Sequence, residues 1–92
     1  MPSNGYGSDA AYFDLLARQS KNDESRRSFR AVAGVYRSLP GTPAARTFQQ
    51  NWQSRAEKCR MLAGQFENPE CRKQLLRLAE TYDFLASCAG KT

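Results

Sequence analysis

The chain contains two similar halves, and this repeat limits the folds open to it more than any other feature. With a shift of 46 residues, residues 13–39 align with residues 59–85, and nine of the 27 aligned positions are identical. The matches include Asn22 with Asn68, Arg26 with Arg72, and Tyr36 with Tyr82. Self-similarity at a fixed offset is typical of a repeated supersecondary unit. We therefore expect two copies of one unit, with convergence of two similar hairpins as the alternative.

The apolar spacing within each half predicts helices and no strands. Residues three and four apart are apolar in four segments, at about 9–20, 23–39, 43–66 and 69–90, and no segment alternates with period two. Ser8 or Asp9 is expected to cap the first helix, and Asn22 the second. Thr42-Pro43 and Asn68-Pro69 each place a capping residue before a proline, which is favourable at the first helical position.

These signals predict an all-α fold of four antiparallel helices, arranged as two duplicated helical hairpins. Residues 1–8 are expected to form a flexible arm, and residues 9–92 a single helical domain. That domain would contain a hairpin over 9–39, a linker over 40–42 and a hairpin over 43–90. One hairpin cannot bury its apolar stripe alone, so we expect the two to pair as a four-helix bundle. A homodimer, in which a second copy covers the remaining stripe, is the alternative.

Composition excludes several kinds of chemistry. The 92 residues include no histidine, which rules out Ser-His-Asp and Cys-His catalysis and histidine-based zinc sites. Three cysteines without a C-x-x-C pair argue against a disulfide framework. No signal peptide or membrane span is visible in the sequence, so a cytoplasmic protein is expected. We expect no enzyme activity, no cofactor and no metal site.

One part of the second half resembles a known group of proteins. The pattern runs from Trp52 through Arg55-Ala56-Glu57-Lys58-Cys59-Arg60-Met61-Leu62-Ala63 and Asn68-Pro69-Glu70-x-Arg72 to Leu75-Leu76-Arg77-Leu78-Ala79-Glu80-x-Tyr82-Asp83-x-Leu85-Ala86. Over residues 52–86 it is similar to small uncharacterised alphaproteobacterial proteins of the rhizobial type. The resemblance implies a helical hairpin and a bacterial cytoplasmic source, and it implies no activity.

Aromatic residues in the second half suggest a protein-interaction surface. The third helix is expected to begin about a dozen residues earlier than its counterpart in the first half, and this extension carries Phe48 and Trp52. Counted outward from the turn near Asn68, Trp52 would lie opposite Phe84, and Phe48 opposite Cys88. Exposed aromatic residues are common anchors of protein interfaces. The sequence predicts an interaction or adaptor-type module that binds a protein partner or itself. In the alternative, these aromatics complete the core.

Clustered basic residues suggest nucleic acid as the alternative partner. The net charge is +5, and basic residues begin the second helix of each half. The residues of this alternative site are Arg26, Arg27, Arg30, Arg72, Lys73 and Arg77. Such a surface could neutralise phosphates, with binding that weakens steeply with salt. The sequence lacks a helix-turn-helix turn, so a solvated face is the simpler interpretation.

Cysteines and carboxylates are the remaining candidates for chemistry. Cys71 lies in the first turn of a predicted helix beside a cation, which favours a thiolate, but core packing is the better expectation. Cys59 and Cys88 fall on the apolar seam and are expected to be buried, and Leu76 widens that seam. Glu80 and Asp83 lie three residues apart, and Glu80 is expected to form a surface ion pair with Arg77.

Overall fold

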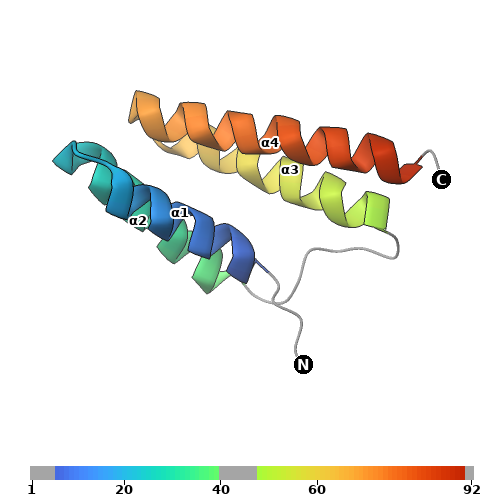
Figure 1. Cartoon of the computed structure of the whole chain (residues 1–92), viewed down its shortest axis with the longest axis horizontal. Helices are drawn as coiled ribbons and strands as arrows, with labels where there is room; N and C mark the ends of the chain where they lie inside the picture. The colour runs from blue at the N-terminus through green and yellow to red at the C-terminus, as the bar shows by residue number, and fades with distance from the viewer. Residues whose placement is uncertain (1–5, 40–47, 91–92) are drawn as a thin grey trace. The chain divides into compact units, whose positions relative to one another are not determined.

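The computed structural model describes residues 6–39 and 48–90, and within them it is entirely helical. The four helices are α1 (Gly7–Gln19), α2 (Asp23–Ser38), α3 (Phe48–Gln65) and α4 (Pro69–Gly90) (Figure 1). The expected all-α class with four helices is confirmed for this part of the chain. The predicted start of the third helix at Pro43 and the linker over 40–42 lie outside the described residues.

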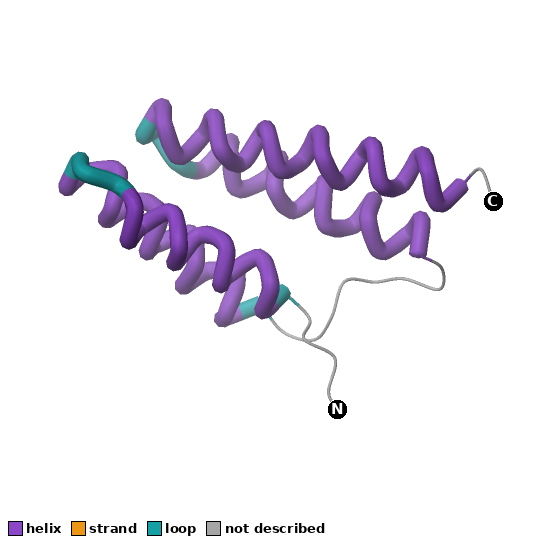
Figure 2. Tube along the Cα trace, viewed as in Figure 1, coloured by secondary structure: helices purple, strands orange, loops and turns teal. Residues whose placement is uncertain are grey.

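The helices pack in two pairs, α1 with α2 and α3 with α4, each joined by three loop residues (Figure 2). Contacts divide the chain into two compact units, Met1–Thr42 and Pro43–Thr92. The expectation of a single domain over 9–92 stays a prediction.

The start of α1 differs from the predicted one. Tyr6 occupies the N-cap position without a side-chain cap hydrogen bond, so neither Ser8 nor Asp9 caps the helix as expected. Asp9 instead lies buried in the first turn. The ring of Tyr6 is buried and lies 5.8 Å from that of Tyr36. Because this packing fixes the chain at Tyr6, α1 begins at Gly7 and overlaps the arm expected over residues 1–8.

Aromatic side chains fill the space between α1 and α2. Phe13 is fully buried, with its ring centroid 5.9 Å from Tyr36 and 6.2 Å from Phe29. Small residues occupy neighbouring buried positions and allow the two helix backbones to approach; they are Ala10, Ala17 and Ala33. Burial of each aromatic side chain stabilises the fold by roughly 1.5–3 kcal/mol.

The core between α3 and α4 uses smaller side chains at the matching positions. Cys59 stands where the first unit has Phe13, and Leu75 where it has Phe29. Both are fully buried. Trp52 stacks on Tyr82 with centroids 5.6 Å apart, and these two positions match Tyr6 and Tyr36 at the 46-residue offset. The buried pattern therefore repeats with the sequence repeat.

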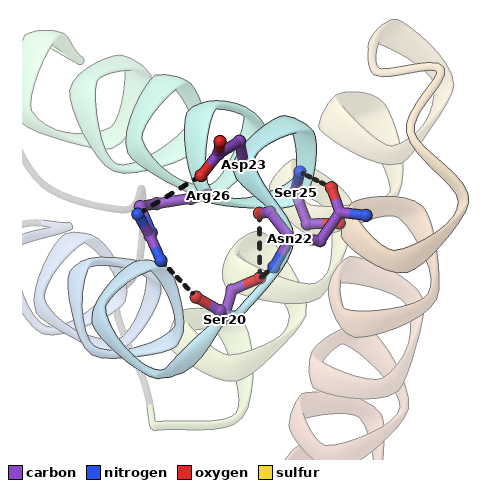
Figure 3. A network of polar contacts seen from close by, with 5 residues as sticks. All are labelled: Ser20, Asn22, Asp23, Ser25 and Arg26. Atoms are coloured by element: carbon purple, nitrogen blue, oxygen red, sulfur yellow. Dashed lines mark hydrogen bonds and ion pairs between the residues drawn. The ribbon is translucent and has the colours of Figure 1, made fainter.

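The turn of each unit has the same hydrogen bonds. The side-chain oxygen of Asn22 accepts from the backbone N–H of Ser25 at 3.0 Å (Figure 3), and that of Asn68 accepts from the N–H of Cys71 at 2.9 Å. Both asparagines therefore cap the second helix of their unit, as predicted.

An arginine braces each turn. The guanidinium of Arg26 donates to the carbonyl oxygen of Ser20 at 2.8 Å (Figure 3), and that of Arg72 donates to Phe66 at 3.0 Å. These donors and acceptors also lie 46 residues apart. The identity of Arg26 and Arg72 in the repeat therefore corresponds to a shared role in closing the turn.

An ion pair links the two helices of each unit, and the two ion pairs have opposite charge order. In the first unit Asp14 on α1 pairs with Arg37 on α2. In the second unit Arg60 on α3 pairs with Asp83 on α4. The offset of 46 residues places Arg60 at the position of Asp14 and Asp83 at the position of Arg37. The position of the ion pair is thus shared, while its charges are exchanged.

Candidate interaction site on α4

One face of α4 forms an open hollow on the surface of the second unit. Its volume is about 450 Å³, and its lining residues are Glu67, Pro69, Arg72, Lys73, Leu76, Arg77 and Glu80. Six of these lie on α4, where the separation between one and the next alternates between three residues and one residue. Residues three and four apart share a helix face, so the lining is a single stripe along the helix.

The start of α4 sets the position of this stripe. Asn68 caps the helix and Pro69 occupies its first position, where a proline costs no hydrogen bond. Arg72 then holds the helix start to the preceding segment, since its guanidinium also donates to the carbonyl oxygen of Ala63 at 3.1 Å. The buried residues of α4 are Cys71, Leu75, Ala79, Tyr82 and Ala86. They lie on the other side of the helix, so the hollow faces outward.

An apolar side chain lies at the centre of the hollow, with cations around it. Leu76 is 43% exposed, one turn after Arg72 and Lys73 and directly before Arg77. The sequence placed Leu76 on the buried seam, and the structure shows that this was wrong. Glu67 and Glu80 lie toward the two ends of the stripe. The three cations outnumber these two carboxylates, so the hollow has a positive charge.

Two of the cations are free to bind another molecule. Within residues 6–39 and 48–90, the side chains of Lys73 and Arg77 form no hydrogen bond or ion pair. The expected ion pair between Arg77 and Glu80 is not formed in this part of the chain. Its order along the helix explains this, because an acidic residue before a basic one is the more favourable arrangement.

The matching face of α2 has a different character. Arg26 donates to Ser20 and also pairs with Asp23 at 3.5 Å. Arg27 and Arg30 are exposed, and Arg30 stands at the position of Leu76. The basic positions predicted as a nucleic-acid site thus lie on exposed helix faces, but two of the six, Arg26 and Arg72, are committed to the turns. The α2 stripe lacks the apolar centre that α4 has.

The three predicted aromatic residues do not form one described cluster. Trp52 is half-buried against Tyr82, whereas Phe84 is 67% exposed. Successive residues turn by about 100° around a helix, so Phe84 projects from α4 about 200° away from Tyr82. The expectation that Trp52 lies opposite Phe84 is therefore wrong. Phe48 is the first residue of α3, and its side chain lies outside the described part of the structure.

Two of the three cysteines are buried, and the third is exposed. Cys71 is fully buried, and this burial raises the pKa of its thiol to about 11. The thiol is therefore neutral near pH 7, and the core role expected for Cys71 is the observed one. Cys59 is buried as predicted, but Cys88 is exposed, which contradicts the expectation for it.

The part of the chain that the structure describes contains neither a metal-binding cluster nor a membrane-spanning helix. No cluster of three or more histidine, cysteine or carboxylate side chains that could hold a metal ion occurs over residues 6–39 and 48–90. None of the described helices is long and apolar enough to cross a membrane.

Comparison with protein-family models, with curated proteins and with solved structures found no match to this chain. The resemblance of residues 52–86 to small alphaproteobacterial proteins stays a prediction. The fold and the site define a small all-helical protein with an amphipathic hollow on one helix.

Proposed function

We propose that this chain is a non-catalytic protein-interaction module and that the hollow around Leu76 is its docking site. The observation that carries the proposal is a leucine 43% exposed beside Arg72, Lys73 and Arg77, on a helix whose opposite side is in the core. Arginine is enriched among interface hot spots, and an exposed leucine gives a partner apolar surface to bury. Because α4 packs on α3 through its buried side, the docking face remains exposed on the other side of the helix.

Nucleic acid is the second candidate, and one observation favours it. Arg27 and Lys73 are exposed at matching positions of the two units, so each unit offers a cation from the same place. Several features of the hollow argue for a protein instead. Its centre is apolar, and carboxylates lie toward both ends of the stripe, where a phosphate backbone would be repelled.

A selection from random peptides displayed on phage tests the proposed function. The full chain is immobilised, and peptides that also bind the Leu76→Ser variant are removed. We expect enriched peptides that bind the chain and the Met61→Ser variant equally. Met61 is a matched control, because it is 45% exposed and belongs to the same unit. A selection that enriches no Leu76-dependent peptide would refute the proposal.

The same chain tested with DNA and RNA oligonucleotides separates the two candidates. If nucleic acid is the partner, the affinity falls by ~10²-fold or more between 50 and 200 mM salt, because the four cations that are not bound to the turns would contact phosphates. The affinity for the oligonucleotide would also be lower in the Lys73→Glu variant and in the Arg27→Glu variant, by similar factors. Such a result, together with an empty peptide selection, would replace the first candidate with the second.

We also propose that the two units are antiparallel hairpins that arose by duplication. Three structural features repeat at the 46-residue offset: the asparagine caps, the arginine braces and the aromatic pairs. Convergent hairpins would need a cap but would not need all three at one offset. The pairing of the two units as one four-helix bundle, the homodimer and the cytoplasmic location stay predictions.

Exchange of the first ion pair tests this equivalence. Asp14→Arg alone should lower the free energy of unfolding by ~1 kcal/mol, because it removes the pair with Arg37 and places like charges together. Adding Arg37→Asp should restore most of the loss, since the double variant has the charge order seen in the second unit. Urea unfolding measures both. The control variant, Asp14→Arg with Arg27→Asp, should not recover the lost free energy of unfolding. An equal recovery in this control would contradict a specific ion pair between positions 14 and 37.

A further inference from the structure

The length of the stripe indicates the shape of its occupant. From Pro69 to Glu80 the lining residues follow α4 for about 16 Å, at a rise of about 1.5 Å per residue. A row at spacings of three and four presents ridges and grooves into which the side chains of a second helix fit. Helix-in-groove binding is a common mode of peptide recognition, in which the bound helix uses apolar residues of the same spacing. The stripe therefore suits a helical segment about three turns long.

The charges of the stripe indicate the composition of that helix. Lys73 and Arg77 have no partner in the described part of the chain, and Arg72 remains a cation although it donates to two carbonyl oxygens. Burying these cations beneath an uncharged partner would leave them without counter-charges, which is costly. Carboxylates on both sides of an apolar anchor would pair with them. Complementary charge of this kind also speeds association.

A second copy of this chain does not satisfy the same requirement. The net charge is +5, and both 1–42 and 43–92 are net positive. Two copies that approach through a basic stripe repel each other at low salt. The observations thus favour a different, acidic protein over self-association at this face.

We infer that the hollow on α4 binds an acidic amphipathic helix of a partner protein, with an apolar side chain of that helix packed on Leu76. This inference rests on the proposed function and specifies its partner. Glutamate or aspartate residues flanking the apolar anchor pair with Lys73 and Arg77. The carboxylates of Glu67 and Glu80, toward the ends of the stripe, disfavour acidic residues beyond this central contact.

Fluorescence anisotropy with three synthetic peptides tests the inference on the full chain. The first is a labelled peptide of glutamate and leucine, about 20 residues long because shorter isolated helices are marginal in water. Its leucines are three and four residues apart. The second has lysine in place of every glutamate, and the third has the first composition in an order without an apolar stripe. We expect binding of the first, binding at least ~10-fold weaker for the third, and none for the second.

Paired variants locate the binding to the hollow. Leu76→Ser and Arg77→Glu should each weaken binding of the acidic peptide ~10-fold or more. Met61→Ser and Arg27→Glu, which change similarly exposed residues elsewhere, should leave it unchanged. Circular dichroism confirms that all four variants keep their helices. An equal loss of peptide binding in the Leu76→Ser and Met61→Ser variants would overturn the inference. Failure of the unaltered chain to bind the acidic peptide would overturn it too.

The two experiments fail in different ways. If the phage selection yields Leu76-dependent peptides without acidic residues, the interaction function stands and the acidic partner is wrong. If it yields no such peptide and the acidic peptide does not bind, both proposals are wrong.

Discussion

Replacing Phe13 by alanine is expected to lower the free energy of unfolding by about 3–5 kcal/mol. Phe13 is 0% exposed, and its ring contacts those of Tyr36 and Phe29 from the middle of α1. The substitution removes the apolar surface of the ring and leaves a cavity between the two helices. Small domains have total stabilities of only about 5–15 kcal/mol, so the loss would be a large part of the whole.

Phe84→Ala provides a control with the same chemical change. Phe84 is 67% exposed on α4, and its removal should alter the stability by no more than ~0.5 kcal/mol. Urea unfolding followed by circular dichroism measures both variants. If Phe84→Ala lowered the stability as much as Phe13→Ala, the side chain of Phe84 would be buried and not exposed. No loss at Phe13 would contradict the core described between α1 and α2.

The positions of the helices followed from local chemistry. Asn22 and Asn68 cap their helices as predicted, because a cap depends on a side chain and the backbone three residues later. The apolar spacing likewise placed Phe29 and Leu75 on buried faces. The start of α1 was missed because it depends on the contact of Tyr6 with Tyr36, which are 30 residues apart. Such a contact leaves no local signal.

The candidate site was less predictable for the same reason. The apolar stripe of an amphipathic helix has two edges, and the sequence does not show which edge a neighbouring element covers. Leu76 and Cys88 are both edge residues of the α4 stripe, and both are exposed. The partner of Trp52 was assigned by counting from the turn, but a difference of two residues moves a side chain to the other side of a helix. The cations flanking Leu76 were the available signal that it faces solvent.

Removal of the arginine brace is expected to have the second largest effect on stability. Arg72→Ala removes two hydrogen bonds, to the carbonyl oxygens of Ala63 and Phe66, at 3.1 and 3.0 Å. These carbonyls end α3 and begin the turn, so the bonds hold the start of α4 against the end of α3. A hydrogen bond with a charged donor contributes about 1.5–3 kcal/mol, and less where solvent reaches it. We expect a total loss of about 2 kcal/mol.

Lys73→Ala is the matched control, because Lys73 is the next residue and is an exposed cation without a described partner. Its effect on urea unfolding should stay within ~0.5 kcal/mol. Arg72→Lys should recover only part of the loss, since a lysine keeps the charge but cannot reproduce the planar, forked donor geometry of the guanidinium. Full recovery by lysine would show that charge, and not the two directed bonds, is what the turn requires.

The same comparison separates stability from binding within the hollow. Arg72 lines the hollow but is bound to the turn, whereas Lys73 and Arg77 have no described partner. Arg72→Ala should therefore lower both the unfolding midpoint and the affinity for the acidic peptide. Lys73→Ala should lower the affinity alone. If both variants lowered only the affinity, Arg72 would be a binding residue and the turn would be held by Asn68 and the packing of the two helices.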